Sequence, residues 1–133
     1  MHGFQFVRDF MVANPVCAEL WQPLSFIRQN MLLNSFSYLP VKVTENGNDC
    51  WRVVSDRVLA AYIREVPDIE RDRLAQTLLE AWQNKQIELE EVKSLDGKKP
   101  IAEAIRILNH LPILVTIGSP SNLAGILTAH DLL

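Results

Sequence analysis

An internal repeat is the feature that most constrains how this chain of 133 residues can fold. Residues 23–59 and 100–133 follow the same order of helix, strand, turn, returning strand and helix start. A repeated unit of this kind does not bury its apolar face alone, so two copies are expected to share a core. The length suits one compact module. We therefore predict an α+β fold built from two similar halves.

The first half carries a local signal for each of its elements. Residues 6–12 are expected to be extended or a short helical turn, and Pro23 suits the first residue of a helix, where its missing N–H costs nothing. Alternating apolar and polar residues over 36–43 predict a strand. Asn46-Gly47 tolerates the positive φ of a hairpin turn, and residues 50–54 return as the second strand. A helix capped at Ser55-Asp56 should then bury four apolar residues: Val58, Leu59, Tyr62 and Ile63.

The second half repeats these signals. Residues 113–117 are expected to form a strand, 118–122 a turn and 123–128 the returning strand. Before them, Pro100 begins a helix whose predicted buried face holds Ile101, Ala104, Ile105 and Leu108.

The segment that joins the halves, residues 67–86, is expected to be a connecting helix. Asp68 is its predicted N-cap. Its apolar stripe either packs on the chain's own domain or offers a surface to a partner. Residues 87–92 alternate apolar and acidic side chains, as a short strand would. The stripe consists of Leu74, Leu78, Ala81 and Trp82.

Composition and motifs exclude several classes of function. The net charge of −3, with both signs mixed along the chain, argues against a nucleic-acid surface. No apolar run approaches the roughly 18 residues of a membrane span, and the first residues lack the pattern of a signal peptide. Cys17 and Cys50 have no CxxC spacing, so we expect reduced thiols in a cytoplasmic protein.

No constellation of catalytic or metal-binding residues is visible. His130 and Asp131 are adjacent, so their side chains would diverge on a helix. The chain has no Gly-x-Ser-x-Gly elbow, no HExxH and no phosphate-binding glycine loop. The sequence therefore predicts neither an enzyme nor a metal site.

The motif residues resemble a tandem pair of CBS domains, which are named after cystathionine β-synthase. The most specific match is Gly125 through Leu133, GILTAHDLL, against the family pattern Gly-apolar-apolar-Thr-x-x-Asp. The resemblance implies two β-α-β-β-α repeats packed as one module, with a first CBS domain over 1–66, a connecting insertion over 67–86 and a second CBS domain over 87–133. The other matching stretches are Val7–Met11, Pro15-Val16, Tyr38–Val41 and Ile113–Val115.

The resemblance also implies a ligand site at Thr128 and Asp131. In nucleotide-binding members the Asp takes the ribose hydroxyls and the Thr contacts phosphate. A carboxylate accepts well from both hydroxyls of a diol, and a Thr hydroxyl beside free N–H groups suits a phosphate. AMP, ADP, ATP or S-adenosylmethionine are the candidate ligands, and none is required. The alternative is an ordinary helix start, with Thr128 as N-cap and Asp131 favouring the helix dipole.

The first half departs from the family pattern. When Ser55 is aligned with Thr128, Val58 stands where the second half has Asp131, and a valine cannot hold a diol. Trp51 falls near the place of the small Gly, where an indole would crowd a base. We therefore expect one nucleotide per chain at most.

The predicted function is regulatory. The module would sense an adenosine-containing ligand through the second repeat and signal through its interface. The alternative is a ligand-free module for protein interaction or oligomerisation. Because family modules commonly pair, we expect a homodimer, with Tyr62, Ile63 and Trp82 near the contact, and neither a nucleic acid nor a membrane as partner.

The second repeat stops at the first turn of its last helix. An isolated turn does not repay helix nucleation, so residues after Asp131 are expected to fray unless something covers them. Two explanations are open. Either the chain is a fragment of a longer protein whose next helix completes the module, or a partner chain lies against Ile126, Leu132 and Leu133.

Overall fold

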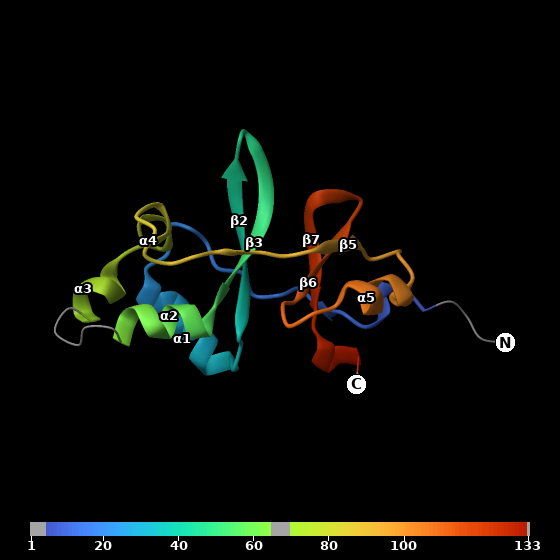
Figure 1. The fold of residues 1–133 in the computed structure, drawn as a ribbon, viewed down its shortest axis with the longest axis horizontal. Helices are drawn as coiled ribbons and strands as arrows, with labels where there is room; N and C mark the ends of the chain where they lie inside the picture. Colours follow the sequence, from blue (N-terminus) through green and yellow to red (C-terminus); the bar gives the residue numbers. More distant parts are fainter. Residues whose placement is uncertain (1–4, 65–69, 133) are drawn as a thin grey trace.

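The computed structural model describes residues 5–64 and 70–132. Two sheets stand side by side, with helices α1–α4 around the first and α5 beside the second (Figure 1). The elements, with η for a 3-10 helix, are η1 (Val7–Asp9), β1 (Val12–Ala13), α1 (Leu24–Asn34), β2 (Tyr38–Glu45), β3 (Asn48–Ser55), α2 (Asp56–Arg64), α3 (Glu70–Ala75), α4 (Leu78–Gln83), β4 (Glu90–Glu91), β5 (Ser94–Asp96), α5 (Ile101–Ile107), β6 (Ile113–Ile117), β7 (Ser119–Leu127) and η3 (Ala129–Leu132).

The first sheet has the strand order β2-β3-β4. The β2–β3 hairpin pairs antiparallel from Tyr38 opposite Ser55 to Glu45 opposite Asn48. Asn46 and Gly47 join the strands with φ of 53° and 79°. The predicted hairpin turn is therefore confirmed, because these two residues tolerate the positive φ that a tight turn requires.

The second sheet has the order β1-β7-β6-β5. β5 runs parallel to β6, whereas β7 is antiparallel to both β6 and β1. The predicted strand over 113–117 is confirmed. The predicted turn over 118–122 is wrong, because β7 already begins at Ser119. Gly118, with φ of 77°, is the single residue between β6 and β7 at which the chain reverses direction. The pairing of the two strands shifts register on either side of Thr116, as at a β-bulge.

The two hydrophobic cores exchange segments. Val7, near the N-terminus, is fully buried in the core of the second half. Ile87 and Leu89, which follow the connection, are buried in the core of the first half. β1 and β4 show the same exchange, since each pairs with a strand of the other half. The division at residues 66 and 87 stays a prediction for the domains, and the packing of these two segments crosses it.

The helices of the repeats agree with the sequence except at Ile105 and at Val58, which is only half-buried against the first core. α1 follows Pro23 directly and buries Leu24, Ile27 and Met31. In α2, the Ser55 hydroxyl accepts from the Val58 N–H at 3.1 Å, and Leu59, Tyr62 and Ile63 are buried. The prediction that Ile105 is buried is wrong, because its side chain is 59% exposed. The inward face of α5 consists of Ile101, Ala104, Ile107 and, just after the helix, Leu108.

The connection between the halves contains two short helices, α3 and α4, in its described part. The break lies at Gln76-Thr77, where the chain pairs with the start of α1: the Leu24 N–H donates to the Gln76 carbonyl at 2.8 Å. Thr77 then caps α4 by accepting from the Glu80 N–H at 3.1 Å. Leu78 and Ala81 are buried in the first core, with Leu74 and Trp82 packed against it, so the apolar stripe packs on its own half. The predicted cap Asp68 lies outside the described residues.

Candidate functional site

A small apolar cavity lies where the two halves meet. Its volume is about 90 Å³. Three segments contribute to it, namely the chain after β1, the start of β2 with the residues before it, and the end of β7. The lining residues are Val12, Asn14, Pro15, Val16, Phe36, Tyr38, Leu39, Pro40 and Ile126.

Backbone pairing brings these segments together. β1 places Val12 opposite Ile126, and the Asn14 N–H donates to the Ala124 carbonyl at 3.1 Å. The chain then crosses to the first sheet, where the Ala18 N–H donates to the Pro40 carbonyl at 2.9 Å. Residues 14–17 therefore bridge the two sheets, and Asn14, Pro15 and Val16 form one wall of the cavity.

The close approach of β1 to β7 requires glycine at position 125. A Cβ at residue 125 would lie 2.4 Å from the Met11 sulfur and 2.9 Å from the Val12 carbonyl oxygen. Real side chains do not make such close contacts, so only glycine lets β1 approach β7 at this point. The glycine of the sequence motif thus has a packing role at the edge of the cavity.

Thr128 and Asp131 lie just beyond Ile126 and bind each other. The Asp131 Oδ2 atom accepts from the Thr128 N–H at 2.8 Å and from its hydroxyl at 3.1 Å. The Asp131 N–H donates to the Thr128 carbonyl at 3.0 Å. The Asp131 side chain therefore caps the backbone N–H of Thr128. In the predicted N-cap, the Thr128 side chain would instead have accepted from a later N–H of the helix. The ligand-binding role of both residues stays a prediction.

The last residues are held by the chain itself. Ala129–Leu132 form the 3-10 helix η3, and Leu132 packs against the second core. The predicted fraying after Asp131 is thus countered at Leu132 by contacts within the chain, whereas Leu133 lies outside the described residues.

The first half has an arginine where the second has its glycine. Alignment of Ser55 with Thr128 puts Arg52 at the place of Gly125. Arg52 pairs with Glu45 at 2.7 Å and Glu91 at 3.1 Å, and its guanidinium lies 5.8 Å from the ring centroid of Trp82. Its side chain therefore occupies the crossing of β3 and β4.

Trp51 precedes the residue that aligns with Gly125 and contacts the other half of the chain. Its indole N–H donates to the Ser121 carbonyl at 3.3 Å, a contact between the two halves. The indole lines a separate hollow beside Cys17 and Trp21. The expectation that Trp51 would crowd a base in the first half stays a prediction, and Arg52 with its carboxylate partners stands beside it at the place of Gly125.

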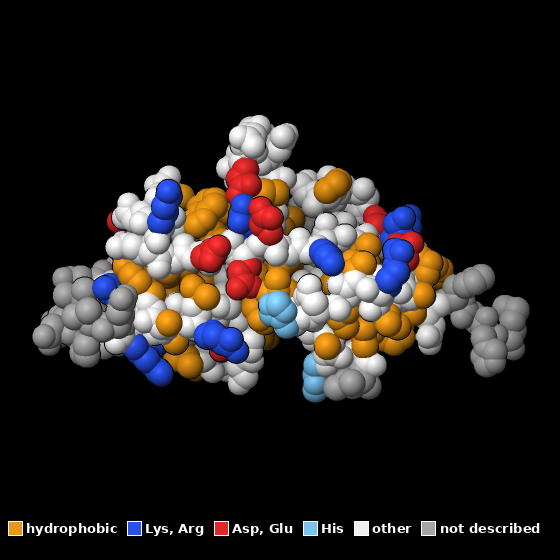
Figure 2. Space-filling view, in the orientation of Figure 1, with side chains coloured by type: hydrophobic (Ala, Val, Ile, Leu, Met, Phe, Trp, Pro, Cys, Tyr) orange, Lys and Arg blue, Asp and Glu red, His pale blue; other side chains and the backbone are white. Residues whose placement is uncertain are grey.

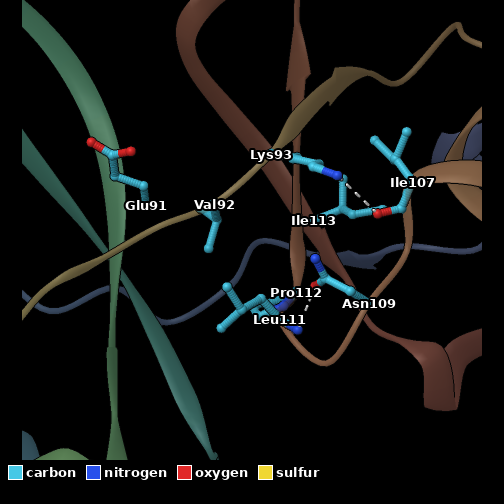
Figure 3. Close-up of a pocket in the computed structure, with 8 residues that line it drawn as sticks. All are labelled: Glu91, Val92, Lys93, Ile107, Asn109, Leu111, Pro112 and Ile113. Atoms are coloured by element: carbon cyan, nitrogen blue, oxygen red, sulfur yellow. Dashed lines mark hydrogen bonds between the residues drawn. The ribbon is translucent and has the colours of Figure 1, made fainter.

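A second, larger hollow is lined by residues 91–113 of the second half. Its volume is about 280 Å³, and it lies between the chain after β4 and the loop before β6 (Figure 3). The Leu111 N–H donates to the Asn109 side chain at 2.8 Å within it. The lining residues are Glu91, Val92, Lys93, Ile107, Asn109, Leu111, Pro112 and Ile113.

Carboxylates surround this side of the molecule. An adjoining hollow, also lined by Glu91 and Leu111, adds Glu88, Glu90 and His110. Figure 2 shows acidic side chains gathered near the middle of the face, next to a histidine. The cations Lys93 and Arg52 line the same two hollows, so both signs of charge are present there.

The residues predicted for the dimer contact are used inside the chain. Ile63 is fully buried and Tyr62 is 8% exposed, both in the first core. Trp82 packs against the same core under Arg52. Tyr62 and Ile63 therefore have little surface of their own to offer a partner, and their place near a dimer contact stays a prediction.

Three titratable side chains among the described residues have shifted pKa values. Backbone N–H groups of Lys98 and Gly118 donate to Asp96 at 2.9 and 3.1 Å, and the Lys98 bond is the main reason that its pKa is lowered. Burial raises the pKa of the thiols of Cys17 and Cys50, which are both free. No trio of His, Cys, Asp or Glu among the described residues could hold a metal ion. No helix in residues 5–64 and 70–132 is long and apolar enough to span a membrane.

Comparison with protein families decides the nature of the second half. Residues 85–133 match the family model described as the CBS domain. This segment is a CBS domain. The match begins before β4 and includes the whole Thr128–Asp131 step. The resemblance to CBS domains is thereby confirmed for this half. No curated protein sequence matches the chain.

Solved structures of CBS-domain proteins share the fold of nearly the whole chain. A CBS domain-containing protein of unknown function from Bacillus anthracis has a TM-score of 0.73 at 17% identity, over 96% of this chain and 89% of that one. A putative acetoin utilization protein from Vibrio cholerae has a TM-score of 0.67 at 20% identity, over 97% and 87%. CBSX2 in complex with AMP has a TM-score of 0.66 at 19% identity, over 98% and 93%. The predicted α+β fold is thus confirmed, and both halves together are consistent with a CBS domain pair.

Proposed function

We propose that the chain is a regulatory CBS module that senses an adenosine-containing small molecule through its second repeat. The observation that carries the proposal is the position of the cavity, which Ile126 lines two residues before Thr128. Among proteins of the same fold, one was solved with AMP and another, CbpB, with c-di-AMP. The role is regulatory rather than catalytic, and the unpaired thiols fit a cytoplasmic location.

The cavity suits one part of such a ligand. Its volume of about 90 Å³ is below the roughly 300–1,000 Å³ typical of sites that enclose a whole small molecule. We expect it to take the flat base, beside the rings of Phe36 and Tyr38, and to leave the ribose at the mouth near Asp131. Aromatic rings contact a flat base well, and a carboxylate accepts from ribose hydroxyls.

The signal would arise because both halves line the cavity. A ligand that touches the chain after β1, β2 and β7 together binds best to one arrangement of the halves. Differential affinity for two arrangements shifts the population between them. A partner that contacts both halves would then bind the ligand-bound arrangement with a different affinity from the ligand-free one.

Calorimetric titration with adenosine, AMP, ADP, ATP and S-adenosylmethionine tests the proposal. We expect one equivalent of ligand per chain. Asp131→Ala should weaken binding by about 1.5–3 kcal/mol, the range for a hydrogen bond to a charged group. Asp49→Ala, which removes a carboxylate near the turn of the β2–β3 hairpin, is the matched control and should leave the affinity unchanged. Two equivalents, or equal effects of both variants, would refute the site.

A second candidate function is a ligand-free interaction module that pairs two copies of the chain. Its support is the outer face of α1, where Leu33 is 74% exposed, Leu32 68% and Phe26 47%. Exposed apolar side chains in one region mark interaction surfaces in soluble proteins. We propose that this face forms the contact of a homodimer.

Light scattering at micromolar concentration tests the homodimer. We expect the mass of two chains, and Leu33→Glu should reduce it to that of one. Ile105→Glu changes an exposed apolar residue on α5 in the same way and should leave the dimer intact. A monomer mass for the unaltered chain would refute the pairing.

A further inference from the structure

We propose that the ligand of the cavity is a nucleoside without a 5′-phosphate, in preference to AMP, ADP or ATP. This inference rests on the proposed function and narrows its ligand class. Two features of the site carry it: the hydrogen bonds within the Thr128–Asp131 step, and the charge of the side chains around the cavity.

The donors that would meet a phosphate are already used. The Thr128 N–H and hydroxyl both donate to Asp131 Oδ2, at 2.8 and 3.1 Å. A phosphate that approached Thr128 would have to displace this carboxylate oxygen, and it would then lie beside a like charge. η3 spans only Ala129–Leu132 and offers no longer run of aligned N–H groups in compensation.

The charge around the cavity points the same way. The lining residues among the described part of the chain include no Lys and no Arg. A monophosphate carries a charge of about −1.5 to −2 at pH 7 and is held in proteins by charge-assisted hydrogen bonds from basic groups or by helix N-termini. A phosphate at the cavity would therefore find no basic side chain among the lining residues.

An uncharged nucleoside has no such conflict. Its base can lie in the apolar cavity between Val16 and the rings of Phe36 and Tyr38. Its ribose hydroxyls can donate to Asp131, whose Oδ1 atom makes no hydrogen bond within the described residues. The hydrogen bonds between Thr128 and Asp131 then stay intact, so binding needs no rearrangement of residues 128–131.

Titration with adenosine and with AMP, under the same buffer and salt, tests the inference. We expect adenosine to bind at least about tenfold more tightly, because the phosphate adds repulsion without a paired cation. AMP that binds as tightly as adenosine, or more tightly, would overturn the inference and leave the proposed function intact. Silence with both ligands, and with the rest of the panel, would overturn the proposed function and the inference together.

A pair of charge variants tests the physical cause. Val16 lines the cavity and is 40% exposed, whereas Ile117 lies outside the lining and is 41% exposed. The ratio of the adenosine and AMP affinities should move toward AMP by about tenfold in Val16→Lys, because a lysine at the rim supplies the missing cation. Ile117→Lys adds the same charge elsewhere and should leave the ratio unchanged. Equal ratios in the two variants would contradict the electrostatic explanation.

Discussion

At the scale of single residues, Gly125 links a sequence motif to a packing requirement. The motif is typical of ligand-binding CBS domains, yet the space at residue 125 is decided by Met11 and Val12, which lie more than a hundred residues earlier. Arg52 at the corresponding place in the first half shows the other solution. There Glu91 of β4 lies opposite Arg52 of β3, and the Arg52 guanidinium also forms ion pairs with Glu45 and Glu91.

Gly125→Ala should destabilise the protein. The added Cβ would lie 2.4 Å from the flexible end of Met11 and 2.9 Å from the Val12 carbonyl oxygen, so β1 must shift away from β7. Overpacking of this kind costs about 1–3 kcal/mol. Urea denaturation of the variant measures the loss in the free energy of unfolding.

A double variant shows which contact matters. Met11→Ala removes the side-chain clash and should recover part of the stability of Gly125→Ala. The backbone oxygen of Val12 does not move with that change, so recovery should be incomplete. An unchanged free energy of unfolding in Gly125→Ala would show that β1 does not lie against β7 in solution.

At the scale of elements, the exchange of segments between the halves is the feature that local patterns could not predict. Pro23, Asn46-Gly47 and Ser55 act on their own neighbours, so their helix start, turn and cap could be predicted from the sequence. Val7 and Leu89 are single apolar residues whose core depends on packing across the whole chain. Nothing in the residues beside them specifies which half they enter.

Because the two cores exchange segments, truncating one buried side chain in each exchanged segment should destabilise a different sheet. Val7→Ala should loosen the second sheet, and Leu89→Ala should loosen the first, because each side chain is buried in that core. Buried large-to-small substitutions cost about 1–5 kcal/mol, depending on the cavity that remains. Hydrogen exchange should accelerate at β6 and β7 in the first variant, and at β2 and β3 in the second.

The two variants serve as controls for each other. Each removes one buried side chain near a crossing strand, so a general loss of stability would affect both sheets alike. If Val7→Ala accelerated exchange in β2 and β3 while β6 and β7 stayed protected, the N-terminal segment would belong to the first half instead.

At the scale of the whole molecule, the candidate site is only partly visible in the sequence. Thr128 and Asp131 stand in a local motif, so the sequence alone identifies them as candidates. Phe36, Tyr38 and Val16 join the cavity only when the chain crosses between the sheets, and their predicted elements carry no sign of a shared surface. The sequence alone shows that the first half has a valine in place of the motif's Asp. The ion pairs of Arg52 with Glu45 and Glu91 are visible only in the structure.

A ligand in this cavity should stabilise both halves at once. The lining residues come from β1, β2 and β7 and the segments beside them, so contacts on one side cannot form without the other. At a ligand concentration of 100 times the Kd, the free energy of unfolding should rise by about 2.7 kcal/mol. Hydrogen exchange with saturating adenosine should therefore slow at β2 and at β7 together. Asp131→Ala, at the same ligand concentration, should reduce the protection in both strands. Protection confined to β6 and β7 would mean that the ligand contacts the second half alone, and the halves would then have no route for a shared signal through this cavity.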